Sequence, residues 1–166
     1  PSGKIEIYST VFEKYGYDPL PKWVNRHAKP SSEYPFYFLT RRWAGHKQSA
    51  PVTSDNPYSL DAFPSPFCWI NEGTAKKLGI KDGDWVYVKS PYGKIKLKAK
   101  LTKVLRPDCV IVEHAFGHTF PMLRYGGKWP SDGYLMPARP EKLVKELKDW
   151  SASAWMLETT VRVEKA

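Results

Sequence analysis

The sequence predicts a mainly β domain, built as a β-barrel with short inserted helices and two long loops. The clearest observation is the alternation over residues 94–101, where every even position is lysine and every odd position is apolar. A period of two is typical of a strand that buries one face. Similar strand-like runs, rich in β-branched and aromatic residues, cover residues 36–40, 85–88, 109–114 and 159–164. The segments with helical character are short, so strands dominate the expected fold.

The first 35 residues lead into this domain. Residues 1–10 resemble a short strand, and residues 11–35 are rich in Pro and Tyr without sustained periodicity. We therefore expect residues 1–35 to form an initial strand and linker, and residues 36–166 to form the barrel. Because the chain starts with Pro1 and not Met, we also expect it to be a fragment of a longer protein.

A buried strand is expected from Phe36 to Thr40, where two arginines end it. Residues 43–66 follow without a periodic pattern and contain scattered Ser, Asn and Pro. An irregular stretch of this length inside a compact domain is usually functional. The first long loop is therefore a candidate site.

Residues 71–100 are expected to form one continuous unit of helix, turn and hairpin. Asn71 supplies an N-cap acceptor for a short helix that ends before Gly79. A turn at residues 81–84 precedes the strand 85–88, and Ser90-Pro91-Tyr92-Gly93 closes the hairpin onto the alternating strand.

The last third of the chain alternates strand, loop, helix and strand. The strand 109–114 follows a turn at Pro107, and residues 116–138, rich in Gly, Pro and aromatic residues, form the second long loop. Pro140 suits the first position of a helix over residues 141–149. The strand 159–164 closes the domain.

Composition limits the classes of protein to consider. The 166 residues suit one domain with its own core. A net charge of +9 favours an anionic partner, namely nucleic acid, a phosphate-bearing cofactor or an acidic protein face. Protection of a sheet edge explains the lysines of 94–100 better than a binding stripe does. No helix-turn-helix, zinc-finger or RNA-binding motif is present, so charge alone does not indicate nucleic-acid binding.

The reactive residue types do not form a known catalytic or metal motif. Cys68 and Cys109 are isolated, which is typical of buried free thiols, whereas iron–sulfur clusters need closely spaced cysteines. His114 and His118 are four residues apart, and two histidines at this spacing can bind one metal ion only if they lie on a helix. No third ligand lies nearby in the sequence. We expect no catalytic residue, no metal ligand and no iron–sulfur cluster in this chain.

Residues 70–86 resemble the signature of a known family. They match the pattern N-x-x-x-A-x-x-L-G-I-x-D-G-D-x-V, which is similar to that of the C-terminal molybdopterin-dinucleotide-binding domain of the dimethyl-sulfoxide-reductase family. Residues 37–49 resemble the pterin loop of that family, with Arg41 where most members have Gly, and residues 1–9 are similar to its linker. The resemblance covers nearly the whole chain. It narrows the expected fold to the six-stranded double-psi β-barrel.

The resemblance implies a set of residues that bind molybdopterin guanine dinucleotide. The arginines suit its phosphates, because a guanidinium donates two parallel charge-assisted hydrogen bonds. Thr, Gln and Ser side chains both donate and accept, as the pterin edge requires. A solvated loop after a strand is the alternative interpretation, and for Asn71 the N-cap role is the stronger one. The expected cofactor-binding residues are Thr40, Arg41, Arg42, His46, Gln48, Ser49, Asn71, His118, Ser131 and Asp132.

The resemblance also implies a function. Through residues 1–21 and 113–118 the chain looks most like the thiosulfate, polysulfide and tetrathionate reductase branch. We expect a cofactor-binding cap domain of a bis-molybdopterin-guanine-dinucleotide oxidoreductase that reduces a sulfur oxyanion or polysulfide, and no activity from the isolated chain. Two alternatives stay open: a free-standing double-psi barrel that binds proteins or nucleic acid, and a separate small subunit of a formylmethanofuran-dehydrogenase-type enzyme.

Partners and location follow from the same resemblance. Molybdenum or tungsten would be held by the cofactor and another domain. The expected partners are the remaining domains of the same polypeptide and an iron–sulfur electron-transfer subunit, with no nucleic acid and no direct membrane insertion. The resemblance favours the periplasm or the outer face of the membrane, and we expect any targeting signal to lie on the missing part of a longer chain.

Overall fold

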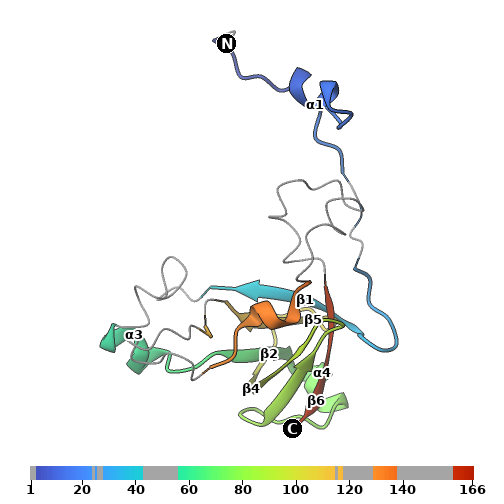
Figure 1. Ribbon diagram of the computed structural model, residues 1–166. Coiled ribbons are helices and arrows are strands. Elements are labelled where there is room, and N and C mark those ends of the chain that lie inside the picture. Colours follow the sequence, from blue (N-terminus) through green and yellow to red (C-terminus); the bar gives the residue numbers. More distant parts are fainter. Residues whose placement is uncertain are drawn as a thin grey trace.

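The computed structural model describes residues 3–23, 25, 28–42, 56–114, 116–117, 129–137 and 159–166. Within them, six strands close into a barrel in the order β1-β5-β2-β4-β3-β6 (Figure 1). The prediction of a mainly β, six-stranded barrel with short helices is therefore confirmed. The strands are β1 Phe36–Arg41, β2 Phe67–Asn71, β3 Trp85–Lys89, β4 Lys94–Thr102, β5 Cys109–Glu113 and β6 Thr160–Lys165.

Short helices accompany the strands. Asn71 caps α4 by accepting hydrogen bonds from the backbone N–H groups of Gly73 and Thr74, which confirms the predicted N-cap. The α-helices are α1 Thr10–Lys14, α3 Pro57–Ala62 and α4 Glu72–Lys77, and η1 Asp132–Leu135 is a 3₁₀ turn. No helix in the described ranges is long and apolar enough to cross a bilayer.

Two parallel strand pairs, β1 with β5 and β2 with β4, lie next to each other in the barrel, and the other strand pairs are antiparallel. In the first pair Arg41 is the register partner of Glu113, so the last residues of both strands lie together. β2 runs antiparallel to β5, with Cys68 opposite Val112. The start of β2 therefore lies at the same end of the barrel as the end of β1.

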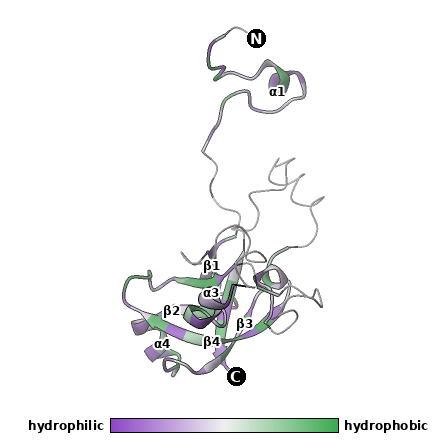
Figure 2. Ribbon diagram, turned by 90° about the vertical axis from the view of Figure 1, so that its left-hand side faces the viewer, coloured by the Kyte–Doolittle hydropathy of each residue, from purple (hydrophilic) through white to green (hydrophobic). Residues whose placement is uncertain are grey.

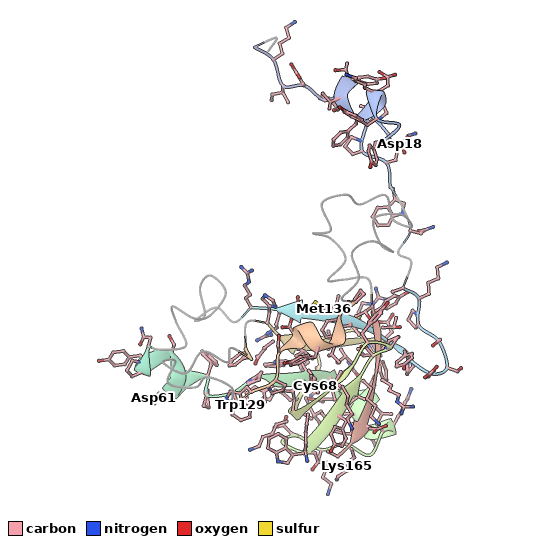
Figure 3. All side chains as sticks on the ribbon, in the orientation of Figure 1. Asp18, Asp61, Cys68, Trp129, Met136 and Lys165 are labelled. Atoms are coloured by element: carbon pink, nitrogen blue, oxygen red, sulfur yellow. The ribbon has the colours of Figure 1, made fainter. Side chains whose placement is uncertain are left out.

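The core fills the barrel with apolar side chains from every strand. Along β4 the predicted alternation holds, because the apolar residues are buried and the lysines are exposed. Figure 2 shows this mixture of hydrophobic and hydrophilic residues on the strands. Cys68 is a fully buried free thiol inside the barrel (Figure 3), as predicted. The largest fully buried apolar side chains are Phe38, Ile70, Leu97, Leu135, Val86, Val88, Val110, Val112 and Val161.

The first described residues differ from the prediction. The strand expected over residues 1–10 is not formed in the described part, residues 3–9, and α1 follows instead. The reason is local: the Ser9 hydroxyl caps α1 by accepting a hydrogen bond from the N–H of Phe12, and Glu13 lies in the first turn. In both views α1 stands away from the barrel (Figures 1 and 2).

Strand β2 and helix α3 were also not predicted, and η1 lies in the segment expected to be the second long loop. Strand β2 has aromatic residues on its outer face and Cys68 and Ile70 inside, so it lacks the polar alternation that marks β4. Helix α3 lies in the segment expected to be irregular, where Asn56 caps it and Pro57 occupies its first turn. The helix predicted over residues 141–149 lies outside the described residues.

Candidate functional site

The end of the barrel where β1 and β5 finish carries most of the described site residues. We call it the β1–β5 rim; it comprises Thr40, Arg41, Glu113 and His114 together with the start of β2 at Phe67. The backbone N–H of His114 donates to the carbonyl of Arg41 at 2.8 Å, which extends the pairing of the two strands by one residue. Thr40 lies two residues after the inward-facing Phe38, so both side chains are on the same face of β1. Thr40 is nevertheless partly exposed, because it lies at the end of the barrel.

One residue of this rim, Glu113, has a buried carboxylate. Glu113 is only 1% exposed, and its two oxygens accept hydrogen bonds from the backbone N–H of Phe67 at 3.0 Å and from the indole N–H of Trp69 at 2.9 Å. Burial raises the pKa of the Glu113 carboxyl above its ordinary value, and the hydrogen bonds and Arg41 limit that rise. Glu113 therefore ties β5 to β2.

Arg41 is held in place by the same two residues. Its guanidinium carbon lies 4.2 Å from the centroid of the Trp69 ring, and one terminal nitrogen lies 3.9 Å from Glu113 Oε1. Such stacking of a cation on an aromatic face restricts the guanidinium to one plane. About a third of the side chain, 31%, stays exposed. Arg41 is thus an oriented cation at the surface of the rim.

A second buried carboxylate, that of Asp132, contacts the imidazole of His114. Asp132 Oδ2 lies 2.8 Å from His114 Nδ1, and the exposed fractions of the two side chains are 1% and 25%. Burial raises the pKa of Asp132, whereas the hydrogen bond with His114 acts in the opposite direction. The imidazole is therefore the accessible member of the pair.

Close backbone approaches hold η1, the turn that carries Asp132. A Cβ added at Gly117 would lie 2.5 Å from the backbone N of Ser131, and one at Gly93 would collide with the carbonyl of Tyr134. Only glycine permits both approaches. Leu135 is fully buried in the core, and the Ser131 hydroxyl caps the turn by accepting from the N–H of Gly133. Asp132 is consequently fixed relative to both the hairpin and the residues after β5.

The structure separates the sequence-predicted site residues into groups. Thr40 and Arg41 belong to the rim, exposed Arg42 directly follows it, and Ser131 and Asp132 belong to η1 beside His114. His46, Gln48, Ser49 and His118 lie outside the described residues. Trp69, Glu113 and His114, which the sequence did not propose as cofactor-binding residues, complete the arrangement. The register of β1, β5 and β2 brings them together.

Asn71 lies at the other end of the barrel, where it pairs with Thr102 of β4. Its side-chain oxygen caps α4, and its amide nitrogen donates to the carbonyl of Leu105 at 2.7 Å. These bonds use the side chain for local structure. An apolar groove of about 330 Å³ is also at this end, lined in part by Phe36, Thr74 and Pro107. Neither feature touches the rim.

The metal-ligating residue types show no grouping in the described ranges. Among those residues no cluster of at least three His, Cys, Asp or Glu side chains is suited to hold a metal ion. The chemistry that the rim offers is hydrogen bonding and charge: one hydroxyl, one oriented guanidinium and one imidazole.

Comparisons with known proteins agree with this description. A family model described as "Molydopterin dinucleotide binding domain" matches residues 36–141. Acetylene hydratase from Syntrophotalea acetylenica is 37% identical over 109 residues, which cover 60% of this chain and 14% of that protein. Thiosulfate reductase molybdopterin-containing subunit PhsA from Salmonella typhimurium is 34% identical over 119 residues, which cover 70% of this chain and 15% of that protein.

A solved structure shows the same fold. Acetylene hydratase from Pelobacter acetylenicus matches with a TM-score of 0.79 and 26% sequence identity, over 100% of this chain and 24% of that chain. The family match covers well over half of the sequence. The closed barrel agrees with it. The chain belongs to the molybdopterin dinucleotide-binding domain family, as the resemblance to dimethyl-sulfoxide-reductase-type enzymes predicts. It spans about a seventh of the length of the two curated relatives.

The residues of the rim fit a molybdopterin dinucleotide. Such a cofactor combines phosphates with a ring edge that both donates and accepts hydrogen bonds. The guanidinium of Arg41 suits the first kind of group, while the hydroxyl of Thr40 and the imidazole of His114 suit the second. The buried carboxylates Glu113 and Asp132 contact Arg41 and His114 from behind, so the positions of these two side chains are set before any ligand binds.

Proposed function

We propose that this chain is the cofactor-binding domain of a molybdenum or tungsten oxidoreductase and that it holds molybdopterin guanine dinucleotide at the β1–β5 rim. The observation that carries the proposal is the family match over residues 36–141, which includes every residue of the rim. The bound cofactor supplies the oxygen- or sulfur-atom transfer, and the domain supplies binding and orientation.

The roles of individual residues follow from their chemistry. Arg41 and Arg42 would hold the phosphates, and Thr40 would hydrogen-bond the pterin edge. The resemblance adds His46, Gln48, Ser49 and His118 to this set. Ser131 would stabilise η1 through its cap, since its hydroxyl already accepts from Gly133. No residue of the chain is assigned a catalytic step.

For the whole enzyme we propose the reduction of a sulfur oxyanion or polysulfide. The similarity to a thiosulfate reductase subunit over 70% of this chain supports this substrate class. An acetylene hydratase is similar at the same level of identity, so this domain is compatible with different chemistry. Substrate choice must therefore depend mainly on the other domains of the enzyme.

The same proposal includes the partners and location. The rest of the polypeptide and an iron–sulfur electron-transfer subunit would complete the enzyme, on the periplasmic side of the membrane. Nucleic acid and direct insertion into the membrane have no part in it.

The test uses the complete enzyme that contains this chain. Bound guanine nucleotide, molybdenum and tungsten are quantified, and reduction of thiosulfate and polysulfide is compared with hydration of acetylene. We expect a guanine dinucleotide cofactor, one of the two metals and sulfur-compound reduction. An enzyme purified without any pterin dinucleotide would overturn the cofactor proposal. Acetylene hydration without sulfur-compound reduction would overturn the substrate proposal alone.

A further inference from the structure

We propose that His114 contacts the bound dinucleotide cofactor directly and that Asp132 is a positioning residue that orients His114. This inference rests on the proposed function of the rim. It changes the role of Asp132, which the sequence suggested as a binding residue, and it adds His114, which the sequence left without a role.

Burial separates the roles of the two side chains. Asp132 is 1% exposed, so its carboxylate has almost no surface to offer a ligand. Its Oδ2 is 2.8 Å from His114 Nδ1, while a quarter of the His114 side chain, 25%, is exposed. A ligand that arrives at this point of the rim therefore meets the imidazole and not the carboxylate.

The hydrogen bond also decides which nitrogen is presented. The two nitrogens of an imidazole lie on different edges of the ring, so a carboxylate that occupies Nδ1 leaves Nε2 on the accessible edge. An ionised Asp132 requires a proton on Nδ1. In the tautomer with the proton on Nδ1, the ring presents an Nε2 lone pair, in the way that carboxylates fix the tautomer of ligating histidines.

The position of the ring is fixed by its surroundings. The backbone N–H of His114 donates a hydrogen bond to the carbonyl of Arg41 at 2.8 Å. The backbone from which the imidazole extends therefore lies beside Arg41, the predicted phosphate-binding residue. The turn that carries Asp132 is held by the close approaches of Gly117 and Gly93 and by the buried Leu135. A hydrogen-bonding group held this firmly loses little freedom when a ligand binds.

The chemistry of Nε2 defines the group that it recognises. A lone pair accepts from an N–H donor, such as the amino group or ring N–H of a pterin or guanine. Arg41, with its positive charge, suits phosphate oxygens instead. The rim would thus distinguish the heterocyclic part of the dinucleotide from its phosphates by the use of adjacent acceptor and donor side chains.

A pair of substitutions in the complete enzyme distinguishes a direct contact of His114 with the cofactor from a purely structural role of His114. In His114→Asn the amide nitrogen replaces Nδ1 and keeps the bond to Asp132, but nothing replaces Nε2. In His114→Gln the amide reaches the position of Nε2. Cofactor per polypeptide is measured during incubation at a fixed temperature, together with the unfolding temperature of the cofactor-free protein.

We expect His114→Asn to lose cofactor about five- to tenfold faster than the unsubstituted enzyme, as the loss of one hydrogen bond requires. His114→Gln should recover part of the retention. Asp132→Ala should behave like His114→Asn, and Asp132→Asn should be intermediate, because its amide oxygen still accepts from Nδ1–H. The matched control is Thr74→Val, which removes the 2.8 Å bond from Thr74 Oγ1 to the Pro107 carbonyl at the other end of the barrel. It should lower the unfolding temperature and leave cofactor retention unchanged.

Retention by His114→Asn equal to that of the unsubstituted enzyme would overturn the inference, since the pair would then be only structural. Equal loss in Thr74→Val would overturn it too, because retention would then follow stability. An unsubstituted enzyme without pterin dinucleotide would instead overturn the proposed function, so the two failures are distinguishable.

Discussion

At the scale of single residues, adjacent arginines at the end of β1 have different environments. Arg41 stacks on Trp69 and lies near the buried Glu113, whereas Arg42 is exposed directly after the strand. Arg41 therefore contributes to the packing of the rim as well as to any ligand contact. Arg42 offers a cleaner test of ligand binding, because its removal leaves the stacked arrangement in place.

We predict that Arg42→Ala in the complete enzyme lowers cofactor content without unfolding the barrel. A charge-assisted hydrogen bond contributes roughly 1.5–3 kcal/mol, while an exposed arginine contributes little to stability. Cofactor per polypeptide and the unfolding temperature are the measurements. Lys98→Ala on the outer face of β4 is the charge-matched control. Full cofactor occupancy in Arg42→Ala would contradict the prediction and would mean that Arg42 is an ordinary solvated surface residue.

We predict that Glu113 makes stability depend on pH. Its folded-state pKa is raised above 4.5, so the folded state binds a proton more readily than the unfolded state does. The free energy of unfolding should therefore fall as the pH rises from that value through the folded pKa. Glu113→Gln cannot titrate and should show a smaller fall, with the contribution of Asp132 remaining. Urea unfolding at a series of pH values measures this, and identical slopes for both proteins would refute it.

At the scale of elements, the alternating strand β4 is the feature that the sequence predicts best. Its lysines are exposed, but the barrel is closed, so protection of a free edge does not explain them. Instead, the Lys94 ammonium lies 4.5 Å from the centroid of the Tyr87 ring, and Lys96 lies 5.5 Å from the Trp85 ring. These contacts place cations over aromatic rings on the outer face of the hairpin.

We predict that Gly93→Ala separates η1 from the hairpin. An added methyl group would collide with the carbonyl of Tyr134, and overpacking of this kind costs about 1–3 kcal/mol. Chemical unfolding of both proteins measures the loss. Gly73→Ala is the matched control, because its Cβ would meet only the Asn71 side chain, at 3.2 Å, and alanine favours the helix there. A loss no greater than that of Gly73→Ala would mean that η1 can move away without cost.

Local patterns predict local structure well and distant pairing poorly. The N-cap at Asn71, the hairpin and the alternation of β4 each depend on a few neighbouring residues, and the structure contains all three. Strand β2 was missed because its evidence lies in its partners, β4 and β5, which are remote in the sequence. The roles of Glu113 and His114 were missed for the same reason, since they depend on the parallel register that sets Arg41 beside Glu113.

At the scale of the whole molecule, the domain has a complete core but only part of a site. Its strands close on a buried apolar interior. The rim presents donors and an acceptor, and no metal-binding cluster is found in the ranges that the structure covers. A barrel of this kind is expected to bind and orient a cofactor while other domains complete the reaction centre.

We predict that the isolated chain folds and shows no turnover. The buried core should give a cooperative unfolding transition, whereas thiosulfate and polysulfide reduction with an artificial electron donor should stay at background. The complete enzyme assayed in parallel is the positive control. Measurable reduction by the isolated chain would show that it contains a reaction centre of its own, and the cofactor-binding role would then be too narrow.

The most direct test of the β1–β5 rim is hydrogen exchange of the complete enzyme, with and without its cofactor, read by mass spectrometry. We predict that the cofactor slows amide exchange at Thr40–Arg42, at Glu113–Gly117 and in η1, with no change in α4 at the other end of the barrel. Slower exchange in α4 together with an unchanged rim would contradict the assignment, because the cofactor would then bind at the Asn71 end.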